Sequence, residues 1–233
     1  EMLFLPLKGY KGFLNIIAFV GLYLTGMFEI QEQLHLAYRN TELMILNIYN
    51  FGFILTGMLL AIKGQSVVKK VIFLMLGTVG ILIYFFYAIP LNKDIVSDII
   101  DAQVAQGPFL LHIILCGLFV LSLLAMQKLF ESVLNNKRES TFGFIAIAII
   151  CLLVGFSELE LVATNYFSNS AIEILTITEN VRIAGYTVLA GIFSFIMMIY
   201  GMRKKERILR IFALTFFGLT LTKLFAFDIQ NIS

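Results

Sequence analysis

The sequence contains two pairs of glutamates that could bind an ion or act in catalysis. Glu29 and Glu32 follow one apolar segment, and Glu158 and Glu160 follow another. Residues three apart share a helix face, and carboxylates that meet at one surface can bind a cation or act as general acid and base. The pairs therefore predict an ion site or the catalytic residues of an enzyme; the alternative is that they belong to ordinary solvated loops.

Three more ionisable side chains lie within or beside apolar segments, where a charge is costly and becomes a candidate for function. Lys223 precedes Asp228 by five residues, and its long stem can bring the ammonium to the membrane surface beside that carboxylate. A buried ion pair and a role in transport are the alternatives. His112 has the chemistry for proton transfer or metal binding. Because His35 is the only other histidine and lies in a predicted loop, a histidine hydrogen-bonded between helices is the simpler interpretation.

The common reaction motifs are missing from the sequence. There is no glycine-rich phosphate-binding loop, no His-Glu-x-x-His and no Cys-x-x-Cys, which disfavours an ATPase and a zinc protease. A b-type cytochrome is disfavoured because it needs paired histidines within the membrane. Cys116 and Cys151 fall in apolar segments, where small buried thiols are expected. We therefore expect no metal and no cofactor.

Transmembrane helices must position all of these residues. Of the 233 residues, 60% are hydrophobic and 14% charged, and the mean hydropathy is +0.93, which is far more apolar surface than one soluble core buries. A helix needs roughly 20 apolar residues to cross a bilayer. Segments of this kind cover residues 12–28, 44–62, 71–89, 108–127, 142–157, 181–202 and 208–227. We predict an all-α polytopic transmembrane bundle of about seven helices, with residues 1–233 as a single transmembrane domain.

The basic residues predict the orientation of the bundle. One set of alternate loops holds most of the 17 Lys and Arg residues, namely Lys8, Lys11, Lys63, Lys69, Lys70, Lys128, Lys137, Arg138, Arg203, Lys204, Lys205, Arg207 and Arg210. The other set holds Arg39, Lys93 and Arg182. Because cytoplasmic loops are enriched in Lys and Arg, we predict the N-terminus inside and the C-terminus outside. The net charge of +2 gives no reason to expect nucleic acid as a partner.

A weak internal repeat accompanies this topology. Gly26-Met-Phe-Glu29 and Gly155-Phe-Ser-Glu158 each end a predicted helix, and similar helices and loops follow both. Parallel repeats occur in several transporter folds, so residues 12–127 and 142–233 are predicted to be two copies of a four-helix unit, the second lacking its last helix. Similar helix spacing alone is the alternative explanation.

The segment after the third predicted helix has a pattern of its own. Pro90 is expected to end that helix, because proline has no N–H to donate. Apolar residues recur at helical spacing over residues 95–106, with Asp98 and Asp101 between them. This pattern predicts a short amphipathic helix that lies on the membrane surface or docks on a partner.

The last third of the chain carries residues found together in a known family. They are Tyr200-Gly201, the basic turn Arg203-Lys204-Lys205, Leu209-Arg210, and a final helix with Lys223 and Asp228 around Leu-Phe-Ala-Phe. This part resembles the bacterial predicted membrane proteins catalogued as domain of unknown function 2339. The resemblance implies a large, many-helix membrane protein and carries over no catalytic or binding residue.

These observations favour a non-enzymatic membrane subunit. We expect a scaffold or transport component of the bacterial cytoplasmic (inner) membrane, with a role in the cell envelope. Membrane lipids are expected partners, together with other membrane subunits or a second copy of the chain. The alternative is an outer-face enzyme that acts on lipid-linked sugars with Glu29 or Glu158 as the acid or base.

Overall fold

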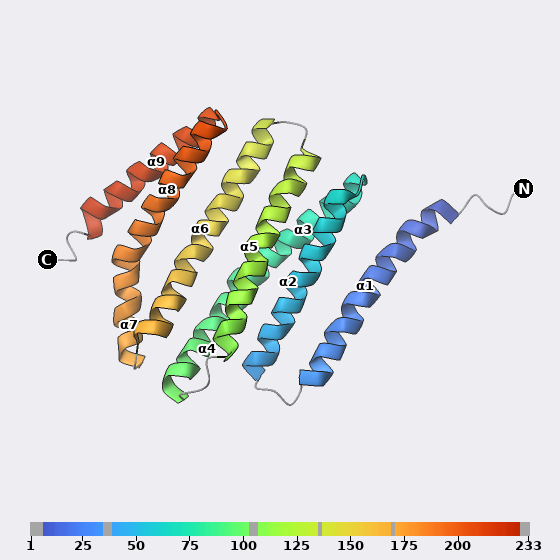
Figure 1. The fold of residues 1–233 in the computed structure, drawn as a ribbon, viewed down its shortest axis with the longest axis horizontal. Helices are drawn as coiled ribbons and strands as arrows, with labels where there is room; N and C mark the ends of the chain where they lie inside the picture. The colour runs from blue at the N-terminus through green and yellow to red at the C-terminus, as the bar shows by residue number, and fades with distance from the viewer. Residues whose placement is uncertain (1–6, 35–38, 103–106, 135–136, 169–170, 229–233) are drawn as a thin grey trace, which may run out of the picture.

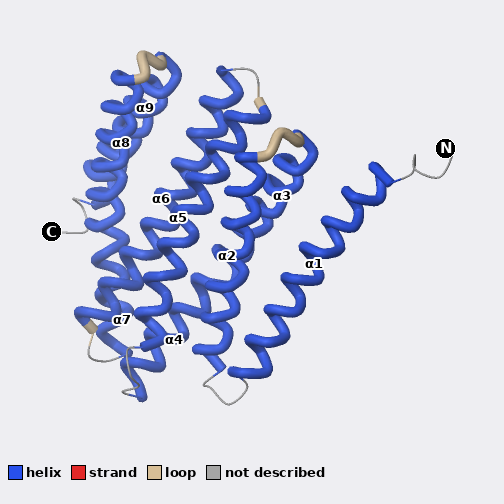
Figure 2. The backbone as a smooth tube through the Cα atoms, turned by 45° about the vertical axis from the view of Figure 1, so that its right-hand side comes forward, coloured by secondary structure: helices blue, strands red, loops and turns tan. Residues whose placement is uncertain are grey.

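A computed structural model describes the chain except for residues 1–6, 35–38, 103–106, 135–136, 169–170 and 229–233 (Figure 1). All regular structure in the described part is helical (Figure 2). The α-helices are α1 (Leu7–Leu34), α2 (Arg39–Lys63), α3 (Val67–Ile83), α4 (Ile89–Ala102), α5 (Gly107–Val133), α6 (Lys137–Phe167), α7 (Ala171–Asn180), α8 (Tyr186–Arg203) and α9 (Arg207–Lys223). Three π-helical turns continue them: η1 (Tyr84–Ala88), η2 (Val181–Gly185) and η3 (Leu224–Asp228). The predicted all-α bundle is confirmed.

Six helical segments in the described residues are long and apolar enough to cross a membrane. They are Thr41–Lys63, Val67–Ile100, Phe109–Val133, Glu139–Phe167, Glu173–Arg203 and Arg207–Ala226, which correspond to the second to seventh predicted spans. The first predicted span lies within α1, a helix of 28 residues that is about 42 Å long at 1.5 Å per residue. Helices suit the interior of a membrane, because each helix satisfies its own backbone hydrogen bonds where no water is available.

Pro90 does not end the third span, and that prediction is wrong. The π-helical turn η1 lies directly before the proline, and the Ile89 N–H donates to the Tyr84 carbonyl, five residues back. The wider turn lets the helix continue past a residue that has no N–H. Helix α4 is therefore the end of the third span rather than a separate helix on the membrane surface, and Ile95 and Val96 are buried against the bundle.

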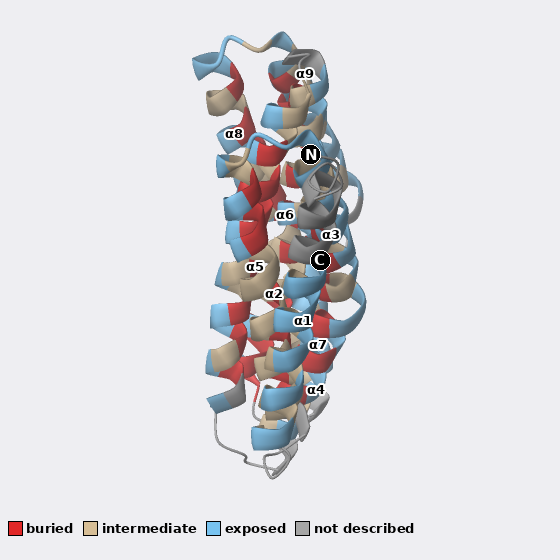
Figure 3. Cartoon of the chain, turned by 90° about the vertical axis from the view of Figure 1, so that its right-hand side faces the viewer, coloured by how far each residue is buried: buried red, intermediate tan, exposed pale blue. Residues whose placement is uncertain are grey.

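The core lies where α5 packs against α2, α3, α4 and α6. Its fully buried side chains include Met44, Met58, Leu115, Phe119 and Leu129. A smaller cluster joins α6, α8 and α9 around Met197 and Leu209. Buried residues follow the inside of the bundle and exposed residues its surface (Figure 3). Many exposed side chains are nevertheless large and apolar, as at Phe86, Val188 and Leu214, which is the surface that lipid requires.

Helix α1 lies at the edge of the bundle, beside α2 (Figure 1). Tyr23 donates a hydrogen bond of 2.8 Å to the Asn50 side chain, and the ring of Phe19 packs against Phe53. Gly26 faces the ring of Tyr49 so closely that a Cβ there would collide with it. Since α2 and α5 stand between α1 and α6, the glutamates of α1 are separated from those of α6.

Candidate functional site

Glu158 on α6 joins side chains from three other segments in a buried network. Tyr84 of η1 donates a hydrogen bond of 2.8 Å to Glu158 Oε1, and His112 Nε2 on α5 lies 2.6 Å from Glu158 Oε2. The other ring nitrogen, His112 Nδ1, lies 2.5 Å from the side-chain nitrogen of Asn92 on α4. The side chain of His112 is 2% exposed and that of Glu158 is 18% exposed. We call Tyr84, Asn92, His112 and Glu158 the Glu158 network.

The π-helical turn η1 sets the register of this network. Residues seven apart share a face of a regular α-helix, whereas Tyr84 and Asn92 are eight apart and both point into the bundle, where they are fully buried. The extra residue that a π-turn inserts brings them onto one face. The ring of Tyr84 stacks on Phe119 at 4.0 Å between centroids, which holds its hydroxyl toward Glu158.

Glu160, two residues further along α6, is the centre of a second network. Lys93 of α4 donates to Glu160 Oε2 at 3.2 Å, and Arg182 Nε of η2 donates to Oε1 at 2.7 Å. The hydroxyl of Tyr186 on α8 donates to Oε1 as well. The carboxylate is 5% exposed, whereas Lys93 and Arg182 are 49% and 58% exposed. These residues form the Glu160 network, in which one buried carboxylate receives the charged partners that burial demands.

Lys223 extends the Glu160 network to α9. Its ammonium donates to Thr187 Oγ1 at 2.8 Å and to the carbonyls of Arg182 and Ile183 at 3.2 and 3.3 Å. These bonds tie Lys223 to η2 and α8, and its predicted reach to the membrane surface stays a prediction. The side chain of Asp228, its expected neighbour, lies outside the described residues. All three π-helical turns thus carry or adjoin the polar layer, as π-turns at functional sites frequently do.

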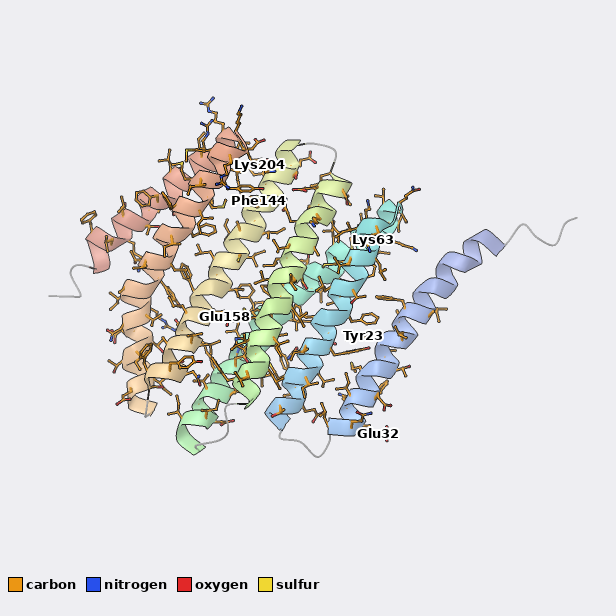
Figure 4. The ribbon with its side chains drawn as sticks, in the orientation of Figure 1. Tyr23, Glu32, Lys63, Phe144, Glu158 and Lys204 are labelled. Atoms are coloured by element: carbon orange, nitrogen blue, oxygen red, sulfur yellow. The ribbon has the colours of Figure 1, made fainter. Side chains whose placement is uncertain are left out.

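Glu29 and Glu32 lie apart from both networks. Helix α1 continues to Leu34, so the two glutamates share a helical segment as predicted. Both are exposed, and Glu29 accepts a hydrogen bond of 2.6 Å from Gln33 one turn on. Figure 4 shows Glu32 at the end of α1 and Glu158 across the bundle. The structure brings Glu158, Glu160, His112 and Lys223 into one polar layer and leaves the α1 pair outside it.

The family model described as "Predicted membrane protein (DUF2339)" matches residues 6–233. The chain belongs to this family. The match covers far more than the last third of the chain, where the sequence itself shows the resemblance. It therefore includes the helices that carry both networks. No curated protein and no solved structure matches the chain. Membership and fold together establish a multi-pass membrane protein.

A small cavity adjoins the Glu160 network of this DUF2339 protein. It measures about 150 Å³ and is lined by Lys93, Val96, Ser97, Glu160, Leu161, Thr164, Ile174 and Thr178. Polar and apolar side chains of α4, α6 and α7 alternate around it, and it is roomy enough for several water molecules. Among the residues that the structure describes, no group of three or more His, Cys, Asp or Glu could hold a metal ion.

Sequence reasoning missed the partners of the two glutamates. Tyr84, Asn92 and Tyr186 carry no sequence signal, because uncharged residues are unremarkable in an apolar helix. Lys93 and Arg182, in contrast, did carry a signal in the sequence. They are two of the three cations in the set of loops that holds few Lys and Arg residues, and a cation in such a place indicates an acidic partner.

Proposed function

We propose that this DUF2339 member is a non-enzymatic subunit of the bacterial cytoplasmic membrane that acts as a scaffold in the cell envelope. The Glu160 network carries the proposal, because one carboxylate ties α4, α6, η2 and α8 together through three donors. A substrate or a transported ion would have to displace an internal partner. Charged groups satisfied within the bundle instead fix which helix faces meet, which is the role best supported for buried polar groups.

The surface of the bundle fits the partners of a scaffold. Large apolar side chains are exposed along α3, η1, α5, α8 and α9, among them Phe86, Leu121, Phe195 and Phe217. Membrane lipids cover such a surface, and apolar faces of other membrane subunits or of a second copy can replace them. We propose these as the partners of the chain, and transport as a further role of the complex.

Complementation of a strain that lacks the gene tests the scaffold proposal. Glu158→Gln keeps the size of the side chain and one oxygen for hydrogen bonding but removes its acid–base chemistry. A scaffold with this substitution should restore the envelope to the level of the unaltered protein. Glu29→Gln serves as the matched control on α1. Failure of Glu158→Gln to complement while the protein is inserted and folded normally contradicts the proposal.

The second candidate is an outer-face enzyme that acts on lipid-linked sugars with Glu158 as acid or base. The 18% exposure of Glu158 and its 2.6 Å contact with His112 favour it, because a carboxylate beside an imidazole can exchange protons with a substrate. Glu29 fits this role less well, since Gln33 is its hydrogen-bond partner. Turnover of a lipid-linked sugar in proteoliposomes, lost on Glu158→Gln and kept on Glu29→Gln, would support the enzyme.

A further inference from the structure

The side-chain amide of Asn92 uses only one of its two polar atoms. Asn92 is 1% exposed and His112 is 2% exposed. The amide nitrogen lies 2.5 Å from His112 Nδ1, whereas the amide oxygen has no hydrogen-bond partner in the part of the chain that the structure describes. A buried oxygen without a partner destabilises a fold, so its presence beside an imidazole calls for a physical reason.

The contacts of His112 define a neutral ring. An amide nitrogen can only donate, so His112 Nδ1 accepts from Asn92 and carries no hydrogen. The ring hydrogen is then on Nε2, which donates to Glu158 Oε2 at 2.6 Å. Half a turn of the Asn92 amide about its Cβ–Cγ bond would exchange its nitrogen and oxygen. The oxygen would then face Nδ1, and that contact is a hydrogen bond only when Nδ1 carries a hydrogen.

In either orientation the amide would make one hydrogen bond to His112 and leave one amide atom without a partner in the described residues. The amide can therefore bond both the neutral ring and the imidazolium, and its bond from the imidazolium is the stronger one because that donor is charged. We propose that His112 is a proton-binding site inside the bundle and that Asn92 is a positioning residue whose amide rotates with each proton bound or released. This site goes beyond the scaffold role.

A hydronium ion of the solvent gives up a proton, which adds to the lone pair of His112 Nδ1 and leaves a water molecule. The bond from Asn92 Nδ2 to Nδ1 breaks, the amide rotates, and the new Nδ1–H donates to Asn92 Oδ1. Glu158 keeps its bond to Nε2–H throughout, and its negative charge balances the imidazolium. No other bond changes in the step, so atoms and charges are conserved.

Ionisable groups surround His112 on several packed elements. Glu158 on α6 bonds the ring directly, and Tyr84 in η1 bonds the other oxygen of Glu158. Cys116 lies one turn along α5, and Lys93 follows Asn92 on α4, where Glu160 neutralises it. Helix α2 has Glu42 in its first turn at the same end, whereas Lys69 and Lys70 lie near the start of α3 at the opposite end. Glu158 is therefore the charge that acts most directly on the proton of His112.

Nitrogen NMR of the histidine-labelled full chain in lipid nanodiscs tests the proposal. The chain has two histidines, so a His35→Gln background leaves the signal of His112 alone. We expect a neutral ring at high pH with its hydrogen on Nε2, and a ring with hydrogen on both nitrogens at low pH. Asn92→Asp supplies a permanent acceptor and should raise the proton affinity of His112 about tenfold or more. Asn92→Leu removes the acceptor and should lower it about tenfold or more.

Asn47→Leu is the matched control, because Asn47 is a buried amide on α2 that bonds the carbonyl of Leu43. It should leave the titration of His112 unchanged. A neutral ring with its hydrogen on Nδ1 overturns the proposal, as does a ring that gains no proton while the protein stays folded. Equal proton affinity in Asn92→Leu and the unaltered chain also overturns it. Should Asn92→Leu fail to fold, Asn92→Asp and the tautomer of the unaltered chain decide.

Discussion

The glutamate pair on α1 and the pair on α6 occupy matching places in the sequence and different surroundings in the fold. Each pair follows an apolar segment with a glycine three residues before its first glutamate. Glu29 and Glu32 are exposed, whereas Glu158 and Glu160 hold hydrogen bonds to five other segments. A shared local pattern therefore does not imply a shared role, because the partners of a buried carboxylate come from elsewhere in the chain.

The positions of α1 and α6 in the bundle explain the difference. Helix α6 lies between α4, α5, α7 and α8, all of which bring polar side chains or close packing to it. Helix α1 lies at the edge against α2 (Figure 1). A carboxylate inside the bundle needs hydrogen-bond donors, whereas one at the edge is satisfied by water or by its own helix. Substitutions in the two pairs test whether position in the bundle accounts for the difference.

Thiol labelling should show the largest difference between the two glutamate pairs. In a background with Cys116 and Cys151 replaced by Ala, we expect Glu32→Cys in intact cells to react with a membrane-impermeant maleimide from outside. Glu160→Cys should stay unlabelled over the same time, because its position is 4% exposed and a buried thiol reacts slowly. Equal labelling at both positions contradicts the comparison. Labelling of Glu32→Cys only in inverted vesicles would contradict the predicted orientation.

Glu158→Leu should be the most destabilising substitution in either pair. It leaves the Tyr84 hydroxyl and His112 Nε2 buried without an acceptor, and such groups cost about 1–3 kcal/mol each. We expect the free energy of unfolding to fall by about 3 kcal/mol, measured by denaturant titration in detergent micelles. Tyr84→Phe combined with Glu158→Leu should recover part of the loss. Full additivity of the two changes would show that they do not interact.

Glu160→Leu should have a smaller effect. Removing one partner of a buried ion pair can cost about 3–5 kcal/mol, but Lys93 and Arg182 are about half exposed and can turn toward water. We therefore expect a loss of about 2 kcal/mol in the same titration. Glu160→Gln should lose less, since its amide oxygen still accepts from Tyr186. A loss as large as that of Glu158→Leu would show that Lys93 and Arg182 do not turn toward water when Glu160 is removed.

Lys223→Met tests the extension of the Glu160 network to α9. Methionine keeps most of the stem but removes the donor to Thr187 and to the carbonyls of η2. We expect a loss of about 1 kcal/mol in the free energy of unfolding. Lys223→Arg should be close to the unaltered chain, because it restores a donor. A stabilised Lys223→Met would show that the lysine is retained for something other than packing.

Glu29→Leu should change least. The side chain is exposed and its hydrogen-bond partner, Gln33, is on the same helix, so removing it leaves no buried group unpaired. We expect no measurable change in the unfolding midpoint, whether measured by heat or by denaturant. A destabilisation comparable with that of Glu160→Leu would mean that α1 meets another surface in the membrane.

The sequence alone determined where in the chain the second to seventh spans lie, with one main exception. Long apolar segments predict helices because lipid leaves the backbone no other partner, and the second to seventh predicted spans are all found. The exception is the third span, which Pro90 was expected to end. A π-helical turn cannot be recognised in the composition of residues 84–88, and the rings that pack against Tyr84 at its start, Phe51 and Phe119, come from other helices.

Which polar residues meet depends on the tertiary structure. Hydropathy sets how deep a residue lies along its helix, but it does not set the rotation of that helix about its axis, which depends on packing against neighbours. Asn92 and Lys93 are adjacent in the sequence, yet one reaches His112 and the other Glu160. The direction in which a helix crosses the membrane follows from its own residues, whereas the partner of a side chain depends on how two helices pack against each other.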